Sequence, residues 1–423
     1  MLEIAIAGYC IYFLVNFYTT FMQIDYVKKA KDGNPVILSQ GGFKVAGNYS
    51  IESNRLGLLT ILYDFVLFFI WIGFGLGVLN DLTSGYEGWM KAVLFIDSFI
   101  IINWLLGLPF DLYSTFVIEK KYGFSNMTKK LYIQDTLKSG MLFLVFGSAV
   151  VAGLSLIIES FPSWWIVGFI FIFALIILIN MVAPYFMMLF NKFEPLKDEV
   201  LREKIEKLLQ SVGFESSGVF SSDASKRDNR LNAYFGGLGG SKRVVLFDTL
   251  IEKLSHNELL AVLGHELGHA KNGDIYKNIG IMGFVLFIFF AIFGNLPEEL
   301  FLGLHLSNEP YAIIVVFMMF SPILSFFLMP LISAMSRHNE YAADRFGSDL
   351  SSKDDLVNAL LKLANENKSF PLSHPIYIFF HYSHPPLVER FKALGFRGAG
   401  IGQMENGKAL KGDCDMNDGF KDE

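Results

Sequence analysis

Cysteine is nearly absent from this chain of 423 residues, in which only Cys10 and Cys414 occur. The first lies in an apolar segment and the second in a polar tail, so we expect neither a structural disulfide nor a cysteine-based metal site. Charged residues are also scarce: they make up 18% of the sequence, and the net charge is only -6. No basic patch with interleaved aromatic residues occurs, so nucleic acid is not an expected partner.

Apolar residues take the place of the missing charges. Hydrophobic side chains make up 52% of the sequence, and the mean hydropathy is +0.42. A water-soluble protein of this length would need more charge on its surface, so the composition predicts a multi-pass α-helical membrane protein. The N-terminus lacks a basic region and a cleavage site, and we expect it to be a retained span. Seven segments are long enough to cross the hydrocarbon core, at residues 3–24, 56–79, 92–116, 139–160, 164–190, 276–296 and 311–335.

The positions of lysine and arginine predict the orientation of these spans. Basic residues gather in the first, third and fifth connections between spans and in the C-terminal region. The second connection has none before Lys91, and the fourth and sixth have none. Because basic loops remain in the cytosol, we expect the N-terminus to lie outside or in the lumen, and the long fifth connection to lie in the cytosol.

The spans divide the chain into five parts. We expect a region of five transmembrane helices at 1–190, a cytosolic segment at 191–275, two further spans at 276–335, a second cytosolic segment at 336–395 and a disordered tail at 396–423. In the first cytosolic segment, an amphipathic helix is predicted near 198–212, and two short strands joined by a glycine-rich turn near 232–237 and 244–248. Ser255 and Glu258 form the capping-box pattern of a third helix in this segment.

That capped helix carries the strongest chemical signal, a His-Glu-x-x-His motif at residues 265–269. His265 and His269 lie on the same helix face, because they are four residues apart, and can bind one Zn²⁺ at roughly 2.0–2.1 Å. Glu266 points about 100° round the helix, beside the metal, where a general base belongs. The alternative is a solvated helix that happens to contain two histidines, and the rest of the chain decides between the two.

A catalytic zinc site needs three protein ligands and one open position. Two spans follow the motif and return the chain to the same side of the membrane just before Glu340. We therefore predict Glu340 as the third ligand of one Zn²⁺ per chain. Asp344 is one helical turn further on and could accept the free N–H of a ligand histidine. Taken alone, a glutamate here would more often be a solvated surface residue, but the motif and the returning hairpin favour the ligand.

With these residues identified, the sequence resembles the type I CAAX prenyl proteases, which are integral-membrane zinc metallopeptidases. The motif at 265–269 pairs with residues 339–346, as in that family. Further segments that are similar to the family's motifs, in the same order, lie at residues 113–124, 184–196, 232–234 and 381–390. The first 50 residues and the C-terminal tail carry no part of the resemblance.

The resemblance implies a ring of seven helices around an intramembrane chamber, with an α+β zinc metallopeptidase domain of the gluzincin type closing its cytosolic side. The substrate would be an isoprenylated or other membrane-associated protein ending in Cys-a-a-X, reached among membrane lipids and cut after the modified cysteine. Asn232, Ala233 and Tyr234 would bind it as an added β-strand. His384 and Arg390 would contact the substrate or the oxyanion of the tetrahedral intermediate; the alternative is a structural His-Pro-Pro turn and an ordinary arginine.

Two other functions stay open at this point. Asp64, Asp97 and Asp111 are costly in lipid and could form the ion path of a transporter, although that function leaves the motif and Glu340 unexplained. The chain could also be a general quality-control zinc protease of the HtpX type, acting on substrates without a prenyl group. Either a bacterial inner membrane or the endoplasmic reticulum membrane fits the predicted topology.

Overall fold

The computed structural model describes residues 1–214, 216–236 and 243–396, and seven helices in this part of the chain are long and apolar enough to cross a membrane. This number confirms the sequence prediction. Five of the helices run beyond the predicted spans, whereas Trp164–Met187 and Asp274–Phe293 end three residues before the predicted limits of 190 and 296; the longest helix has 43 residues, about twice what a bilayer needs. The tail expected to be disordered, 396–423, lies outside the described residues apart from Phe396.

Three of the membrane helices contain a π-helical turn. The helices are α1 (Leu2–Ala30); α2 (Gln40–Ile70), which continues through η1 (Trp71–Gly75) into α3 (Leu76–Leu82); α4 (Gly88–Tyr113), which continues through η2 (Ser114–Ile118) into α5 (Glu119–Lys121); α6 (Lys129–Leu142), which continues through η3 (Phe143–Gly147) into α7 (Ser148–Ser160); α8 (Trp164–Met187); α12 (Asp274–Phe293); and α14 (Pro310–Leu350). A short helix, α13 (Glu298–Gly303), connects α12 to α14.

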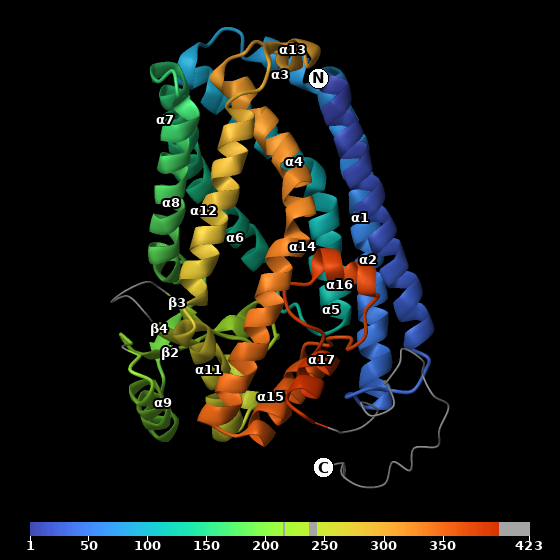
Figure 1. Ribbon diagram of the computed structural model, residues 1–423, viewed down its shortest axis with the longest axis vertical. Coiled ribbons are helices and arrows are strands. Elements are labelled where there is room, and N and C mark those ends of the chain that lie inside the picture. Colours follow the sequence, from blue (N-terminus) through green and yellow to red (C-terminus); the bar gives the residue numbers. More distant parts are fainter. Residues whose placement is uncertain (215, 237–242, 397–423) are drawn as a thin grey trace.

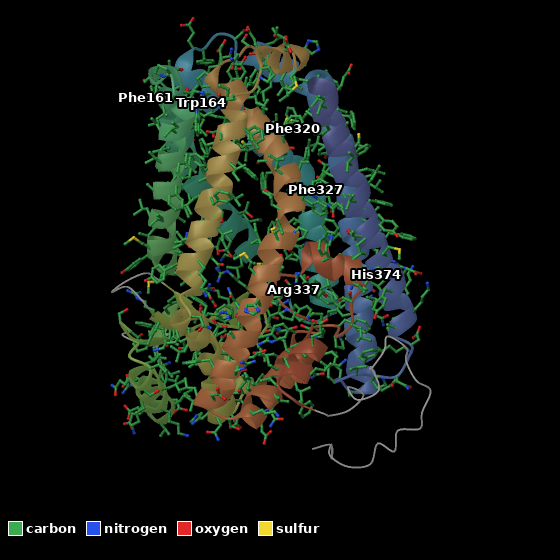
Figure 2. All side chains as sticks on the ribbon, in the orientation of Figure 1. Phe161, Trp164, Phe320, Phe327, Arg337 and His374 are labelled. Atoms are coloured by element: carbon green, nitrogen blue, oxygen red, sulfur yellow. The ribbon has the colours of Figure 1, made fainter. Side chains whose placement is uncertain are left out.

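The seven helices pack as a closed ring. In order, α1 contacts α2, α2 contacts η2, α4 contacts α7, α7 contacts α8, α8 contacts α12, α12 contacts α14, and α14 contacts α1. Figure 1 shows them side by side along the long axis, with the α+β domain at one end. The largest buried cluster includes Trp71, Phe95, Phe301 and Tyr311. Figure 2 places Trp164, which packs against this cluster, at the end of the ring away from the domain.

Two of the intramembrane acids have hydrogen-bond partners on neighbouring helices. Asp97 accepts a hydrogen bond from Ser148, with an oxygen–oxygen distance of 2.6 Å, and Asp111 accepts one from Tyr132 at 2.5 Å. These bonds compensate part of the cost of placing a carboxyl group in an apolar environment.

The α+β domain contains, among the described residues, one four-stranded sheet of order β1-β2-β4-β3. β4 runs parallel to β2 and antiparallel to β3. Because β3 is last in the strand order, it lies at an edge of the sheet. The sequence predicted β3 and β4 but not the other two strands. The elements of the domain are β1 (Phe193–Pro195), α9 (Glu199–Ser211), β2 (Val219–Ser222), η4 (Ala224–Lys226), β3 (Ala233–Gly236), β4 (Arg243–Phe247), α10 (Asp248–Lys253), α11 (His256–Lys271), α15 (Lys353–Glu366), α16 (Pro375–His381) and α17 (Leu387–Ala393).

The start of α11 is fixed by the predicted capping box. The Ser255 hydroxyl accepts a hydrogen bond from the Glu258 N–H, and the Glu258 carboxylate accepts one from the Ser255 N–H at 2.7 Å. Leu259, Leu263 and Leu267, at helical spacing, are buried against the sheet and α9. The helix is thus held at its N-terminus and along one face, which fixes the direction of the other face.

That other face of α11 crosses α14 at backbone contact. A Cβ added at Gly268 would lie 2.8 Å from the Ala343 Cα, and one at Gly347 would lie 2.7 Å from the backbone nitrogen of His265. Both distances are shorter than real Cβ contacts, so these positions require glycine for the two helices to meet. The close crossing brings the His-Glu-x-x-His motif against the last turns of α14.

Candidate metal centre and active site

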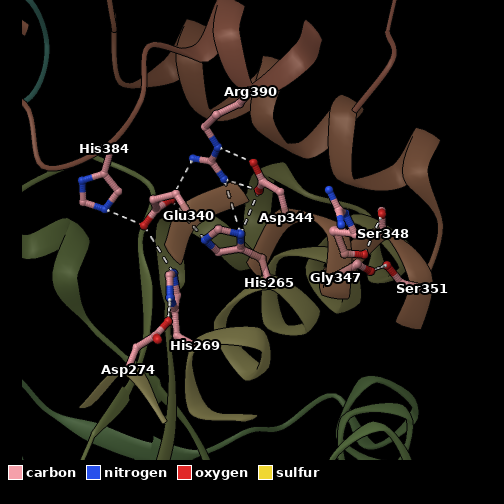
Figure 3. Close-up of polar contacts among 11 residues, drawn as sticks. His265, His269, Asp274, Glu340, Asp344, Gly347, Ser348, Ser351, His384 and Arg390 are labelled. Carbon is pink, nitrogen blue, oxygen red and sulfur yellow. Dashed lines mark hydrogen bonds and ion pairs between the residues drawn. The ribbon is translucent and has the colours of Figure 1, made fainter. Parts of the chain in front are cut away.

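His265 and His269 of α11 and Glu340 of α14 converge at this crossing (Figure 3). One ligand atom from each lies within 4.8 Å of the others. His265 Nε2 is 3.6 Å from Glu340 Oε2, and His269 Nε2 is 3.3 Å from Glu340 Oε1. The helix crossing therefore brings together the three residues that the sequence predicted as ligands, although 340 lies far from 269 in the chain.

A carboxylate hydrogen-bonds to the Nδ1 atom of each histidine. Asp344 Oδ1 is 2.8 Å from His265 Nδ1, and Asp274 Oδ2 is 2.9 Å from His269 Nδ1. Both aspartates are buried. A proton held on Nδ1 by such a bond leaves the Nε2 lone pair of each ring free for a metal ion.

Asp274 was missed in the sequence analysis. It begins α12 immediately after Gly273, whose left-handed φ of 68° turns the chain back towards α11. The signal available was an acid placed directly after a glycine that follows the motif helix. Lys277 also contacts it, with 2.9 Å between Nζ and Oδ1, so the carboxylate is held from two sides.

The three converging residues fit a divalent metal ion. Glu340 Oε2 is buried and has no hydrogen-bond partner. Such an orphaned carboxylate oxygen is costly, and a cation held among the three ligand atoms would compensate it. Two imidazole nitrogens and one carboxylate oxygen form a donor set typical of catalytic zinc.

Glu266 belongs to the same cluster of charges. Burial raises the pKa of its carboxyl group above the ordinary value, and Glu340 acts in the same direction. Positive charge on His265 or His269 would lower that pKa. The carboxyl group is thus partly withdrawn from solvent and lies in the same group of charged side chains as the three converging residues.

Arg390 and His384 approach Glu340 from the C-terminal segment, as Figure 3 shows. Arg390 of α17 is buried and forms a two-point contact with Asp344, at 2.7 Å from Nε to Oδ2 and 2.5 Å from Nη2 to Oδ1. Its Nη1 atom is 3.6 Å from Glu340 Oε2. The His384 side chain is 65% exposed, and its Nε2 atom is 3.2 Å from Glu340 Oε1. Of these two residues, His384 is the one accessible to a substrate.

The segment predicted to bind substrate lies at the edge of the sheet. Ala233 and Tyr234 begin β3, where they pair with Leu246 and Val245 of β4. Asn232 precedes the strand and is exposed, and its backbone C=O accepts a hydrogen bond from the Phe247 N–H. β3 also packs against α11, so its free edge is near the helix that carries the motif.

Comparison with known proteins finds family profiles, relatives and a crystal structure that are similar to this chain. The profile of Peptidase family M48 matches residues 195–397, and that of the CAAX prenyl protease N-terminal region, with five membrane helices, matches 23–192. CAAX prenyl protease 1 homolog of Oryza sativa is 34% identical over 379 residues, covering 85% of this chain and 88% of that protein. CAAX prenyl protease 1 of Saccharomyces cerevisiae is 35% identical over 329 residues, 72% of each chain. The crystal structure of S. mikatae Ste24p matches with a TM-score of 0.84 at 30% identity, covering 93% of this chain and 98% of that one.

Proposed function

This chain belongs to the CAAX prenyl proteases of peptidase family M48, which makes it a membrane metalloendopeptidase, and we propose that it uses one Zn²⁺ to cleave prenylated proteins ending in Cys-a-a-X. The observation that carries the proposal is the convergence of His265, His269 and Glu340 at the end of the ring of membrane helices. A substrate anchored by a prenyl group would reach this point from the lipid.

The chemistry that Zn²⁺ supplies when bound is activation of a water molecule and polarisation of the scissile carbonyl group. Glu266 is the general base in this proposal: it takes a proton from the attacking water and returns it to the leaving nitrogen. The buried position of its carboxyl group raises its pKa, which suits a group that must accept a proton and then release it.

The residues around the ligands hold the site in shape. We assign Asp344 and Asp274 to the orientation of His265 and His269, on the evidence of their Nδ1 contacts. Arg390 neutralises Asp344 through its two-point contact and lies close to Glu340. Exposed His384 is the residue that can donate a hydrogen bond to a developing oxyanion.

The substrate peptide would extend the sheet at β3. An edge strand has free N–H and C=O groups that pair with an extended peptide, and Asn232, Ala233 and Tyr234 supply these groups in the proposal. Because β3 contacts α11, a peptide on this edge would pass close to the ligands.

We place the N-terminus outside or in the lumen and the catalytic domain in the cytosol. Lys28 and Lys29 end α1 at the end of the ring that carries the domain, whereas the N-terminus lies at the opposite end (Figure 1). This arrangement follows the preference of basic residues for the cytosolic side, in a bacterial inner membrane or in the endoplasmic reticulum.

Paired peptides test the substrate assignment. Detergent-purified protein is given a farnesylated Cys-a-a-X peptide or the same peptide without the lipid, and the products are measured by mass spectrometry. We expect kcat/KM to be about 10-fold or more higher for the farnesylated peptide, because the apolar chain adds binding energy. Equal cleavage of both peptides would contradict the assignment and favour a quality-control protease of the HtpX type.

A further inference from the structure

A cavity of about 410 Å³ lies where α8, β3 and α12 meet. This volume is within the range of roughly 300–1,000 Å³ that small-molecule sites have. Figure 1 shows the lower ends of α8 and α12 reaching β3, at the boundary between the ring of helices and the catalytic domain. We infer that this cavity binds the isoprenoid chain of the substrate, an inference that rests on the proposed function.

The lining of the cavity is suited to a hydrocarbon. Ile275, Ile279 and Met282 follow one another at helical spacing on α12, and Ala183 and Met187 do so on α8. No charged side chain is among the described residues that line it; its polar groups are two asparagines and a tyrosine. A phosphate headgroup or a charged peptide side chain would therefore find no counter-charge in the lining, whereas an uncharged branched chain would be covered by apolar groups.

One wall residue of the cavity is adjacent in the sequence to a residue of the metal centre. Ile275, in its wall, directly follows Asp274, whose carboxylate is 2.9 Å from the Nδ1 atom of His269. The isoprenoid is attached to the cysteine whose carbonyl group is attacked. Its chain must therefore leave the active site within the length of one side chain, and Ile275 in the cavity wall is next in the chain to a residue that contacts a predicted ligand.

β3 connects the cavity to the proposed peptide site. Tyr234 and Gly236 are two residues apart, so they face the same side of the sheet, and both line the cavity. A Cβ at Gly236 would lie 3.2 Å from Pro184 Cγ of α8, so glycine keeps this part of the wall clear. The strand can thus bind the peptide backbone with its edge and the lipid with its face.

Changing the size of the cavity tests the inference. The full-length protein and its Ile279→Trp and Ile279→Ala variants are assayed with peptides that carry geranyl, farnesyl or geranylgeranyl chains. We expect Ile279→Trp to reduce the farnesyl-to-geranyl ratio of kcat/KM by about 10-fold or more, and Ile279→Ala to favour geranylgeranyl. The matched control is Ile292→Trp, on the same helix but outside the lining, which should leave the ratios unchanged.

Photolabelling decides between the inference and its alternatives. A peptide with a diazirine on its farnesyl chain is crosslinked to the unsubstituted protein, and labelled residues are identified by mass spectrometry. Labels within 183–187 and 275–282, displaced by unlabelled farnesylated peptide, support the inference. Labels elsewhere, with farnesyl-dependent cleavage intact, overturn it and leave the proposed function standing. Labelling displaced only by phospholipid would make the cavity a lipid site, and loss of any farnesyl preference would overturn both proposals.

Discussion

Replacing Glu266 by glutamine is expected to reduce kcat/KM for peptide cleavage by about 10²–10⁴-fold while the protein keeps its bound metal. Glutamine has nearly the same shape but cannot take a proton from water, so the chemical step is lost and the fold is retained. Since Glu266 is not among the three residues whose ligand atoms converge, the metal content of the variant, measured by mass spectrometry of the purified protein, should equal that of the parent.

A glutamate away from the site provides the control for this experiment. Glu203 on α9 is exposed, and Glu203→Gln should leave both cleavage and metal content unchanged. If Glu266→Gln lost its metal together with its activity, Glu266 would be a ligand and its assignment as general base would be wrong.

The second large effect concerns the ligand supplied by α14. Glu340→Gln should abolish cleavage and lose the metal, because a neutral amide replaces the only anionic member of the predicted ligand set. Asp349→Asn, at an exposed position of the same helix, is the matched control and should behave like the parent. Retention of a full complement of metal by Glu340→Gln would exclude Glu340 as a ligand.

Asp274→Asn should give a smaller effect than the ligand substitution. The carboxylate contacts His269 and does not reach the metal position, so its loss is expected to weaken metal binding by about 10–100-fold. Titration of the metal-free variants with Zn²⁺ ranks the two substitutions. An Asp274→Asn variant with unchanged affinity would show that the contact does not orient the histidine.

The membrane helices and the two motif histidines could be predicted from the sequence because both depend on regular spacing. Long apolar segments identify membrane spans from the sequence alone. Residues 265 and 269, four apart, lie on one face of an α-helix wherever that helix packs. Glu340 was predicted from topology, since the two intervening spans must return the chain to the same side of the membrane. The structure brings it to 3.3 Å from His269 Nε2.

The parts that sequence did not predict depend on contacts between separate segments. β1 and β2 have three and four residues, and no short glycine-rich segment links them in the sequence as one links β3 to β4. The pairing of β1 with β2 and of β2 with β4 forms only in the folded domain. The contact of Asp274 with His269 spans the turn between α11 and α12, where Gly273 adopts a left-handed conformation. The two-point contact of Arg390 with Asp344 joins α17 to α14, and nothing in the local sequence of either helix indicates it.

Removal and restoration of the metal tests the central claim most directly. The purified protein is treated with a zinc chelator, freed of it, and assayed with a farnesylated Cys-a-a-X peptide before and after addition of Zn²⁺. The account predicts that release of the C-terminal tripeptide stops on chelation, returns with about one Zn²⁺ per chain, and does not return in the Glu340→Gln variant. Undiminished cleavage by protein shown to contain no metal would contradict it.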